Sequence, residues 1–220
     1  MFEIVKDGVT EEVLNDLTRY FVDHTQDHYV NWVTPDGVLI DHRCQIDPKS
    51  RTYANMKNIV QRHFKGEFKF WTAYQKQTNP HRLHIDDYGK DRKNPTYTIV
   101  MPMFTDPRVK TYVFQDIFAD NVAWQQHTAT WCKMVRMKMK MNQPKSNISE
   151  TEDLEHTVDP NVNAYIADYL ELDGIFHYER GSYVLFDSNQ VHASSNWRKY
   201  PEYQSKEILQ IHITDLSTTV

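Results

Sequence analysis

The sequence has little of what stabilises small secreted proteins or membrane proteins. Only two cysteines occur in 220 residues, Cys44 and Cys132, and they do not form a CxxC pair. Two distant cysteines make neither a disulfide framework nor a cysteine-based zinc site. No apolar run reaches the roughly 18 residues that a spanning helix needs, and the N-terminal MFEIVKDGVTEE lacks the apolar segment of a signal peptide. We therefore expect a soluble cytoplasmic protein without a membrane partner.

The sequence also has little excess charge, since its formal net charge is −5 at pH 7. A nucleic-acid-binding surface usually gives a domain a strongly basic balance, so we expect no nucleic-acid partner. A chain of this length suits one domain whose core needs no disulfide or metal to stabilise it. Histidine is abundant, with 11 copies, and it is both a common metal ligand and a proton carrier.

The first part of the chain is predicted to form a helical layer, residues 1–66. TEEVLNDLTRYFVDHT offers Thr10 as an N-cap, two glutamates in the first turn and apolar residues at helical spacing. A second helix is expected to open at Asp47-Pro48 and to stop at Gly66.

From residue 67 the pattern predicts strands. EFKFWTAYQ, TYTIVMPM, KTYVFQDIF and VRMKMKM are short aromatic or β-branched runs between turn residues, and further runs lie in IFHYERGSYVLFDS and KEILQIHITDL. Between these two groups we expect a polar loop at 142–156 and one more helix at 159–173. The fold class is therefore mainly β with flanking helices, a single domain 1–220 with a jelly-roll core at 67–220.

A candidate metal site lies in the stretch NPHRLHIDDYGKD, residues 79–91. Residues two apart in a strand point the same way, so His84 and Asp86 in HID would share a face, with Cα atoms about 7 Å apart. An imidazole and a carboxylate at this spacing can converge on one ion. The HxD pattern alone is weak, because about one match is expected by chance in such a histidine-rich chain. A polar strand end that enters a turn is the alternative interpretation.

A second pair, His177 and Glu179 in HYE, has the same spacing. A site of two histidines and one carboxylate needs a third ligand from a later strand and leaves positions on the iron open. The segment ERGSYVLFDSNQVHASSNW supplies His192. The HYE pair lies too near His192 to allow the intervening strands of a rolled sheet, whereas His84 and Asp86 leave ample room.

The order of these motifs resembles that of the Fe(II)- and 2-oxoglutarate-dependent dioxygenases, in particular the prolyl-hydroxylase-like members. HxD is followed by a distant histidine in GSxxxFDSxxxH and then by Lys206, which opens the apolar run KEILQIHI. The match covers residues 67–214. The resemblance implies a double-stranded β-helix in which His84, Asp86 and His192 hold Fe(II) and 2-oxoglutarate chelates the iron, with ascorbate as a supporting reductant.

The far carboxylate of 2-oxoglutarate would need a buried cation, because an unpaired buried carboxylate is costly. The resemblance gives this role to Lys206, although many members place the basic residue closer to the distal histidine. Arg198 is the alternative, in a stretch that looks like a loop. Tyr74 stands ten residues before His84. Prolyl-hydroxylase-like members often have a tyrosine near the co-substrate there, and a core tyrosine is the other interpretation.

The sequence therefore predicts a hydroxylase that converts 2-oxoglutarate to succinate and CO2. Its substrate would be a peptidyl side chain, an amino acid or a small metabolite, and the sequence fixes neither the choice nor the oligomeric state. The alternative from another class is a non-oxidative, cupin-like jelly roll that binds a metal or a sugar. Lys206 discriminates between the two, since a non-oxidative binder needs no buried cation facing the metal. A third possibility is a structural β-sandwich whose histidines bind no metal.

Overall fold

The computed structural model of the chain describes residues 1–24, 29–33, 39–81, 86, 96–117 and 172–215. In this part the elements are β1 (Phe2–Val5), α1 (Glu11–His24), β2 (Tyr29–Val33), β3 (Leu39–Gln45), α2 (Arg51–Gln61), β4 (Lys69–Gln77), β5 (Tyr97–Pro102), β6 (Asp106–Ile117), β7 (Leu172–Tyr178), β8 (Tyr183–Asp187), β9 (Gln190–Ser194), the 3-10 helix η3 (Trp197–Lys199) and β10 (Lys206–Thr214). In the described part of the chain, no helix is both long and apolar enough to cross a membrane.

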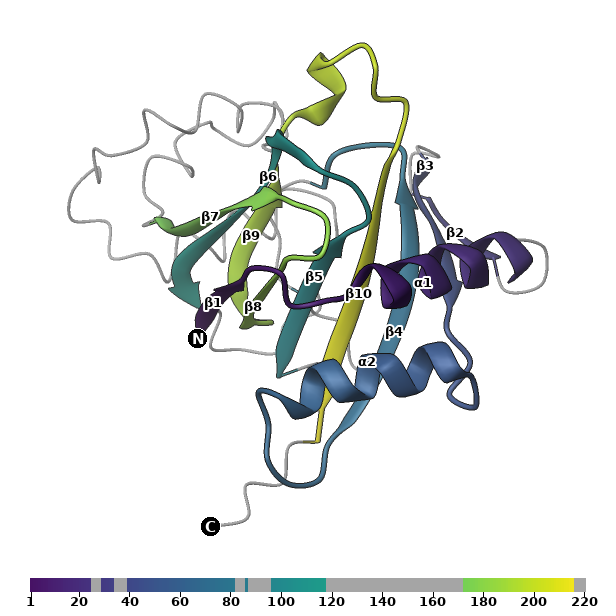
Figure 1. Cartoon of the computed structure of the whole chain (residues 1–220). Helices are drawn as coiled ribbons and strands as arrows, with labels where there is room; N and C mark the ends of the chain where they lie inside the picture. The colour runs from purple at the N-terminus through teal and green to yellow at the C-terminus, as the bar shows by residue number, and fades with distance from the viewer. Residues whose placement is uncertain (25–28, 34–38, 82–85, 87–95, 118–171, 216–220) are drawn as a thin grey trace.

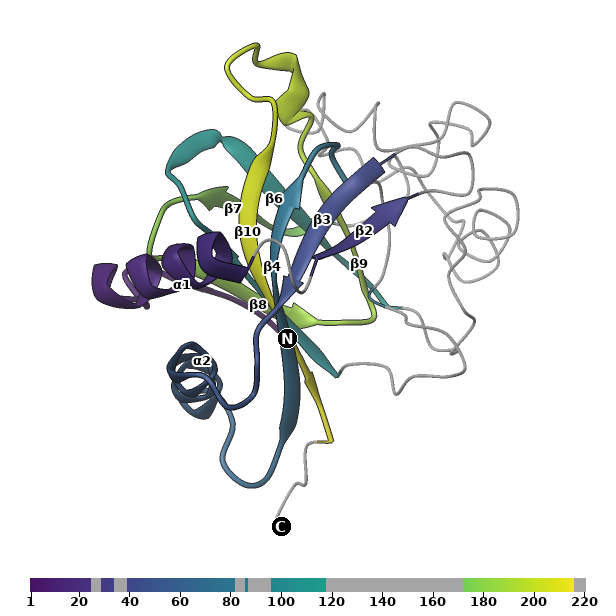
Figure 2. The same ribbon diagram turned by 90° about the vertical axis from the view of Figure 1, so that its right-hand side faces the viewer.

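The described strands form two antiparallel sheets (Figure 1). The larger sheet has the order β1-β8-β5-β10-β4-β3-β2, and the smaller one has the order β7-β6-β9. In Figure 1, α1 and α2 lie across β10 and β4, and Figure 2 shows both helices on one side of the larger sheet. Two antiparallel sheets with a helical layer outside correspond to the predicted double-stranded β-helix with flanking helices.

The two faces of the larger sheet carry two different cores. On β10, Leu209 and Ile211 belong to the core that packs against α1 and α2. Ile208 belongs to a second core, which includes residues of the smaller sheet. Because successive side chains of a strand alternate, Lys206 and His212 share the face of Ile208, between the two sheets. The alternation thus places Lys206, Gln210 and His212 in the space enclosed by the jelly roll.

Residues 1–66 are not purely helical, which corrects the expectation from the sequence. α1 begins after Thr10 as predicted, and the Thr10 hydroxyl accepts a hydrogen bond of 3.5 Å from the Val13 N–H. However, β1 forms one edge of the larger sheet beside β8, while β3 and β2 extend the other side beyond β4. β1 is short and precedes α1, while β2 and β3 lie between α1 and α2, so the helical periodicity of their neighbours dominates the local sequence pattern.

α2 begins later than the predicted opening at Asp47-Pro48. The Ser50 hydroxyl is the N-cap: it accepts a hydrogen bond of 3.0 Å from the Tyr53 N–H and donates one of 2.7 Å to the Asp47 carbonyl. Asp47 forms the preceding turn instead, where its carboxylate accepts from the Lys49 N–H at 2.9 Å. Aspartate and serine are both good N-caps, but Asp47 and Pro48 lie in a turn, so α2 begins only after Ser50.

The strands predicted after residue 67 are found wherever the structure describes the chain. EFKFWTAYQ falls in β4, TYTIVMPM in β5, and KEILQIHITDL in β10. Gly181 makes the predicted turn before β8 with φ 88°, a conformation that favours glycine. The predicted strand VRMKMKM, the loop at 142–156 and the helix at 159–173 lie outside the described residues.

Candidate metal centre

Asp86 lies between β4 and β5, and the turn between β8 and β9 fixes its position. The Asp86 N–H donates to the Ser188 carbonyl at 2.9 Å, and the Ser188 N–H donates to the Thr96 carbonyl at 3.1 Å. The Asp86 side chain is buried, with 7% of the residue exposed. A buried carboxylate is costly unless it is paired or binds a metal, so this position requires strong partners.

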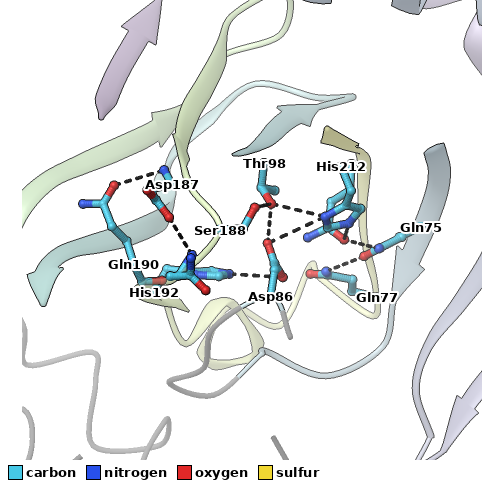
Figure 3. Close-up of polar contacts among 11 residues, drawn as sticks. Gln75, Gln77, Asp86, Thr98, Asp187, Ser188, Gln190, His192 and His212 are labelled. Atoms are coloured by element: carbon cyan, nitrogen blue, oxygen red, sulfur yellow. Dashed lines mark hydrogen bonds and ion pairs between the residues drawn. The ribbon is translucent and has the colours of Figure 1, made fainter. Parts of the chain in front are cut away.

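β9 carries His192 toward Asp86 (Figure 3). The ring is buried, and its Nδ1 lies 2.9 Å from the Gln190 carbonyl oxygen. Because a carbonyl can only accept, Nδ1 donates, and Nε2 is the nitrogen that faces Asp86, 3.7 Å from its Oδ1. Two donors that each lie about 2 Å from a shared ion are at most about 4 Å apart, and this separation is within that limit. A carboxylate and a neutral imidazole are ligands that divalent iron accepts, so the two residues fit such a metal.

The third predicted ligand, His84, lies outside the described residues. The nearest described residues on either side of it, His81 and Asp86, are both held by the β8–β9 hairpin: the Ser194 N–H donates to the His81 carbonyl at 3.0 Å, and the Asp86 N–H donates to Ser188. Within the described ranges, no three His, Cys, Asp or Glu side chains gather into a metal-binding group. A three-ligand site at Asp86 therefore requires a residue such as His84.

The rival HYE pair lies at the outer surface of the smaller sheet. His177 is exposed on β7, and its Nδ1 donates to the Pro107 carbonyl at 2.8 Å. Glu179 is also exposed, just beyond the end of that strand. The pair therefore lies away from the space between the two sheets.

A group of buried hydroxyl and ring nitrogen atoms surrounds the other oxygen of the carboxylate (Figure 3). The Thr98 hydroxyl donates to Asp86 Oδ2 at 2.6 Å. The same hydroxyl oxygen lies 2.9 Å from Ser188 Oγ and 3.2 Å from His212 Nδ1. These residues come from β5, the β8–β9 turn and β10, so three separate elements converge on one carboxylate.

Three glutamines extend this network across the inner face of the larger sheet. Gln210 Oε1 lies 3.3 Å from His212 Nε2 and accepts a hydrogen bond from Gln75. Gln75 Oε1 in turn accepts from Gln77 Nε2 at 3.0 Å. Burial lowers the pKa of His212 to about 4, although the nearby Asp86 carboxylate acts in the opposite direction. His212 is therefore neutral at pH 7 and takes part in the network through hydrogen bonds.

Lys206 opens β10, and its side chain crosses the space between the sheets. The residue is 2% exposed. Its ammonium donates to Ser194 Oγ on β9 at 2.7 Å and to the Tyr178 hydroxyl on β7 at 3.2 Å. In the described part of the chain, these two hydroxyl groups are its hydrogen-bonding partners, and no carboxylate pairs with it. Burial lowers the pKa of Lys206 to about 7, because water no longer solvates the charged form.

The structure places the other two candidates for co-substrate binding elsewhere. Arg198 is exposed in η3, where it donates to the Thr78 carbonyl at 2.7 Å. Tyr74 lies on the helix side of β4: its ring stacks on Phe21 of α1 at 4.1 Å, and its hydroxyl donates to Glu207 at 2.6 Å. Tyr74 is therefore a core tyrosine, and the expectation that it lies in the co-substrate site is corrected.

Residue spacing in the sequence did not predict the hydroxyl groups that lie beside Asp86 and beside Lys206. Ser194 could have been predicted, because it stands two residues after His192 and so shares its face on β9. Thr98 and Tyr178 lie on other strands, β5 and β7, and only the arrangement of the strands brings them beside Asp86 and Lys206. Residue spacing alone therefore cannot predict either of them.

No protein-family model matches the chain. No curated protein matches its sequence either. Solved structures do match, and they share the two-sheet jelly roll described above. The chain therefore has the double-stranded β-helix fold of these structures, among which are enzymes described as non-heme and alpha-ketoglutarate-dependent.

Three of the similar structures illustrate the likeness. The non-heme alpha-ketoglutarate-dependent carbocyclase SnoK from nogalamycin biosynthesis has a TM-score of 0.60 at 12% identity, over 97% of this chain and 79% of SnoK. The epimerase SnoN in complex with Fe3+, alpha-ketoglutarate and nogalamycin RO has a TM-score of 0.55 at 9% identity, over 97% and 78%. A Pseudomonas putida prolyl-4-hydroxylase has a TM-score of 0.51 at 11% identity, over 97% and 91%. At such low identities the likeness establishes the fold and not the reaction.

Proposed function

We propose that the chain is an Fe(II)- and 2-oxoglutarate-dependent oxygenase, and specifically a hydroxylase. The proposal depends above all on Lys206, a buried ammonium that forms no ion pair with a carboxylate among the described residues. It lies on the same inner face as His212 and the Asp86 network. A metal site alone has no need of such a cation, whereas a co-substrate with two acidic ends does. The fold shared with SnoK and SnoN supports the same assignment.

In this proposal the metal ligands are His84, Asp86 and His192. Asp86 and His192 already face one another, and the HxD spacing puts His84 two residues from the carboxylate. Two histidines and one carboxylate on one side of the ion leave positions open for the co-substrate and oxygen. The iron, when bound, supplies the oxygen chemistry, while the protein holds the ligands in place.

The 2-oxoglutarate would extend from the metal position beside His192 to the ammonium of Lys206. His192 and Ser194 are two residues apart on β9, so their Cα atoms lie about 7 Å apart on one face. The 2-oxo acid end would lie beside His192, and the far carboxylate would accept hydrogen bonds from Lys206 and Ser194. Burial raises the pKa of Tyr178, so its hydroxyl stays protonated and can donate to the same carboxylate.

Apolar side chains exclude water from this space. Val113, Phe176, Ile208 and Trp197 belong to the buried cluster between the sheets. A low local dielectric strengthens the attraction between an ammonium and a carboxylate. The exclusion of water also protects reactive intermediates from hydrolysis. The cluster would therefore help both to bind the co-substrate and to keep the reaction confined.

The substrate of the proposed hydroxylation would be a small organic molecule or a peptidyl side chain. SnoN has been solved with nogalamycin RO, which favours a small molecule for this chain. The similarity to a prolyl-4-hydroxylase keeps a peptidyl substrate open.

Metal titration of single variants tests the proposal. Asp86→Ala and His192→Ala should each abolish stoichiometric Mn(II) binding, measured by electron paramagnetic resonance of unbound Mn(II), and His84→Ala should do the same. His177→Ala is the matched control, because that histidine is exposed and bonded to a backbone carbonyl. Full Mn(II) affinity in two of the three ligand variants would contradict the assignment.

The oxidative part of the proposal has its own test. With Fe(II), ascorbate, oxygen and 2-oxoglutarate, the wild-type protein should slowly form succinate even without its substrate, as measured by chromatography with mass detection. The Asp86→Ala protein should form none. If the wild-type protein binds Mn(II) but neither binds 2-oxoglutarate nor forms succinate, the non-oxidative metal-binding jelly roll becomes the better assignment.

A further inference from the structure

The two carboxylate oxygens of Asp86 have different surroundings (Figure 3). Oδ1 lies 3.7 Å from His192 Nε2. Oδ2 accepts a hydrogen bond of 2.6 Å from the Thr98 hydroxyl and lies 3.8 Å from His212 Nδ1. One oxygen therefore faces the proposed metal position, while the other is turned toward β5 and β10.

Thr98 is itself held rigidly in place. It is fully buried on β5, and its Oγ1 lies 2.9 Å from Ser188 Oγ. Ser188 also accepts the Asp86 N–H through its carbonyl at 2.9 Å, so Asp86, Ser188 and Thr98 form a closed ring of hydrogen bonds. A hydroxyl has one proton, which Thr98 donates to Asp86, so Ser188 must donate to Thr98. The 2.6 Å bond lies in the range of strong, charge-assisted O–H···O contacts.

We infer that Thr98 is a positioning residue that makes Asp86 bind the metal through one oxygen only. The inference rests on the metal site proposed above. With Oδ2 bonded to Thr98, only Oδ1 is turned toward the ion. Without the hydroxyl, the carboxylate can rotate about χ2 and either withdraw from the ion or bind through both oxygens, which would fill a position that the co-substrate or oxygen needs.

The test compares Thr98→Val, which keeps the shape of the side chain and removes the hydroxyl, with Thr98→Ser, which keeps the hydroxyl. Partners of metal ligands typically change metal affinity by about 10- to 100-fold, so Thr98→Val should weaken Mn(II) binding by this factor. It should also change the visible absorption spectrum of the Co(II)-loaded protein, which reports the coordination number. Thr98→Ser should restore both properties to within about threefold of wild type.

Thr72→Val is the matched control. Thr72 is a buried threonine of the same sheet, 2% exposed, whose hydroxyl donates to the Gln210 carbonyl at 2.8 Å. This variant should lose some thermal stability and keep the wild-type Mn(II) affinity and Co(II) spectrum. If Thr98→Val does not fold, Ser188→Ala replaces it, because it removes the hydrogen bond that orients the Thr98 hydroxyl, and it should weaken Mn(II) binding by about threefold.

The outcomes separate this inference from the proposed function. If the wild-type protein does not bind Mn(II), the metal site itself is wrong. If the wild-type protein binds Mn(II), and the folded Thr98→Val protein, or Ser188→Ala in its place, has the same affinity and Co(II) spectrum, the positioning role of Thr98 is refuted.

Discussion

Lys206 is an unusual residue to find in the interior, because burial removes the water that would solvate its charge. Among the described residues its ammonium donates hydrogen bonds to two hydroxyl groups and lies 4.9 Å from the centre of the Tyr178 ring, and its pKa falls to about 7. A hydroxyl offsets the lost hydration less well than a carboxylate does. A residue kept at such a cost is expected to serve binding rather than folding, and its variants separate the two contributions.

The first prediction at this scale concerns affinity. Lys206→Ala removes one partner of the proposed buried ion pair, which should cost about 3–5 kcal/mol of 2-oxoglutarate binding. Since each 1.4 kcal/mol is about tenfold, the affinity measured by calorimetry on the Mn(II) form should fall by a hundredfold or more. Lys206→Arg should recover part of the loss. Arg198→Ala should change little, because that side chain is exposed, and a larger loss for Arg198→Ala than for Lys206→Ala would reverse the assignment.

The second prediction concerns pH. In the protein without co-substrate, the pKa of Lys206 is lowered to about 7 by burial, and a bound carboxylate should raise it again. Above pH 7, binding of 2-oxoglutarate must therefore take up a proton, and the affinity should weaken as the pH rises, by at most about tenfold per pH unit. Calorimetry at several pH values, in buffers of different ionisation enthalpy, measures this uptake. Lys206→Arg should show a flat profile over the same range, since a guanidinium stays protonated.

The third prediction at the residue scale concerns stability. Lys206→Met replaces a buried ammonium with an apolar side chain of similar length, so the protein without ligands should melt at a higher temperature while it loses co-substrate binding. For a chain of this size, 1 kcal/mol corresponds to roughly 2–4 °C in Tm. Differential scanning calorimetry measures the change. A clear decrease in Tm would show that the hydroxyl partners, Ser194 and Tyr178, are worth more to folding than the buried charge costs.

At the scale of elements, the alternation of strands explains how one sheet serves two purposes. On β10, Leu209 and Ile211 complete the core beneath the helices, whereas Lys206 and His212 face the space between the sheets. The same alternation on β4 gives Tyr74 to the helix side and Gln75 to the inner network. A shift of one residue in the register of β10 or β4 would turn the core residues toward the space between the sheets and the site residues toward the helices.

One prediction at this scale concerns the N-cap of α2, which lies outside the proposed metal and co-substrate site. The Ser50 hydroxyl caps α2, and removal of such a cap typically costs about 1 kcal/mol. Ser50→Ala should therefore lower the free energy of unfolding by this amount in urea denaturation, with Mn(II) and 2-oxoglutarate affinities unchanged. Lys49→Ala, an exposed neighbour, should have no measurable effect, and Ser50→Asp should retain the cap.

The sequence predicted the elements better than their ends and partners. α1 was predictable because Thr10 caps it and apolar residues recur at helical spacing, and β10 because KEILQIHI alternates after a turn. β1 to β3 were missed because short strands next to helices carry a weak periodic signal. Tyr74 was misassigned because a count of residues from His84 does not reveal which face of β4 the ring occupies. Thr98 was not predictable, since it meets Asp86 only through the arrangement of three separate elements.

At the scale of the whole molecule, Asp106 connects the start of β6 to the segment between η3 and β10. It accepts hydrogen bonds from Arg108 at 2.6 Å and from Tyr203, which lies between η3 and β10. These bonds, above all that with Arg108, hold the pKa of the Asp106 carboxyl well below its usual range. Because its folded pKa is lowered, Asp106 stabilises the fold above the unfolded pKa of about 4 and loses this contribution as the pH falls.

Asp106→Asn should therefore lower the stability at pH 7 by about 1–2 kcal/mol, a range that allows for the half-exposed Arg108. It should also flatten the loss of Tm between pH 5 and 3, as measured by thermal denaturation monitored by circular dichroism. Glu202→Gln is the control, because this second partner of Arg108 is itself about half exposed, at 48% of the side chain. An equal loss of stability in both variants would mean that Arg108, and not Asp106, makes the connection.

β10 follows every other described strand in the sequence, yet it lies in the middle of the larger sheet, paired with β5 on one side and β4 on the other. A ribosome therefore makes both neighbours before the strand that joins them. Until β10 emerges, β4 and β5 each present an unpaired edge, and Lys206 is still missing from the chain. Such edges invite pairing with other chains, so a stalled or truncated nascent chain should be far more prone to aggregate than the finished protein.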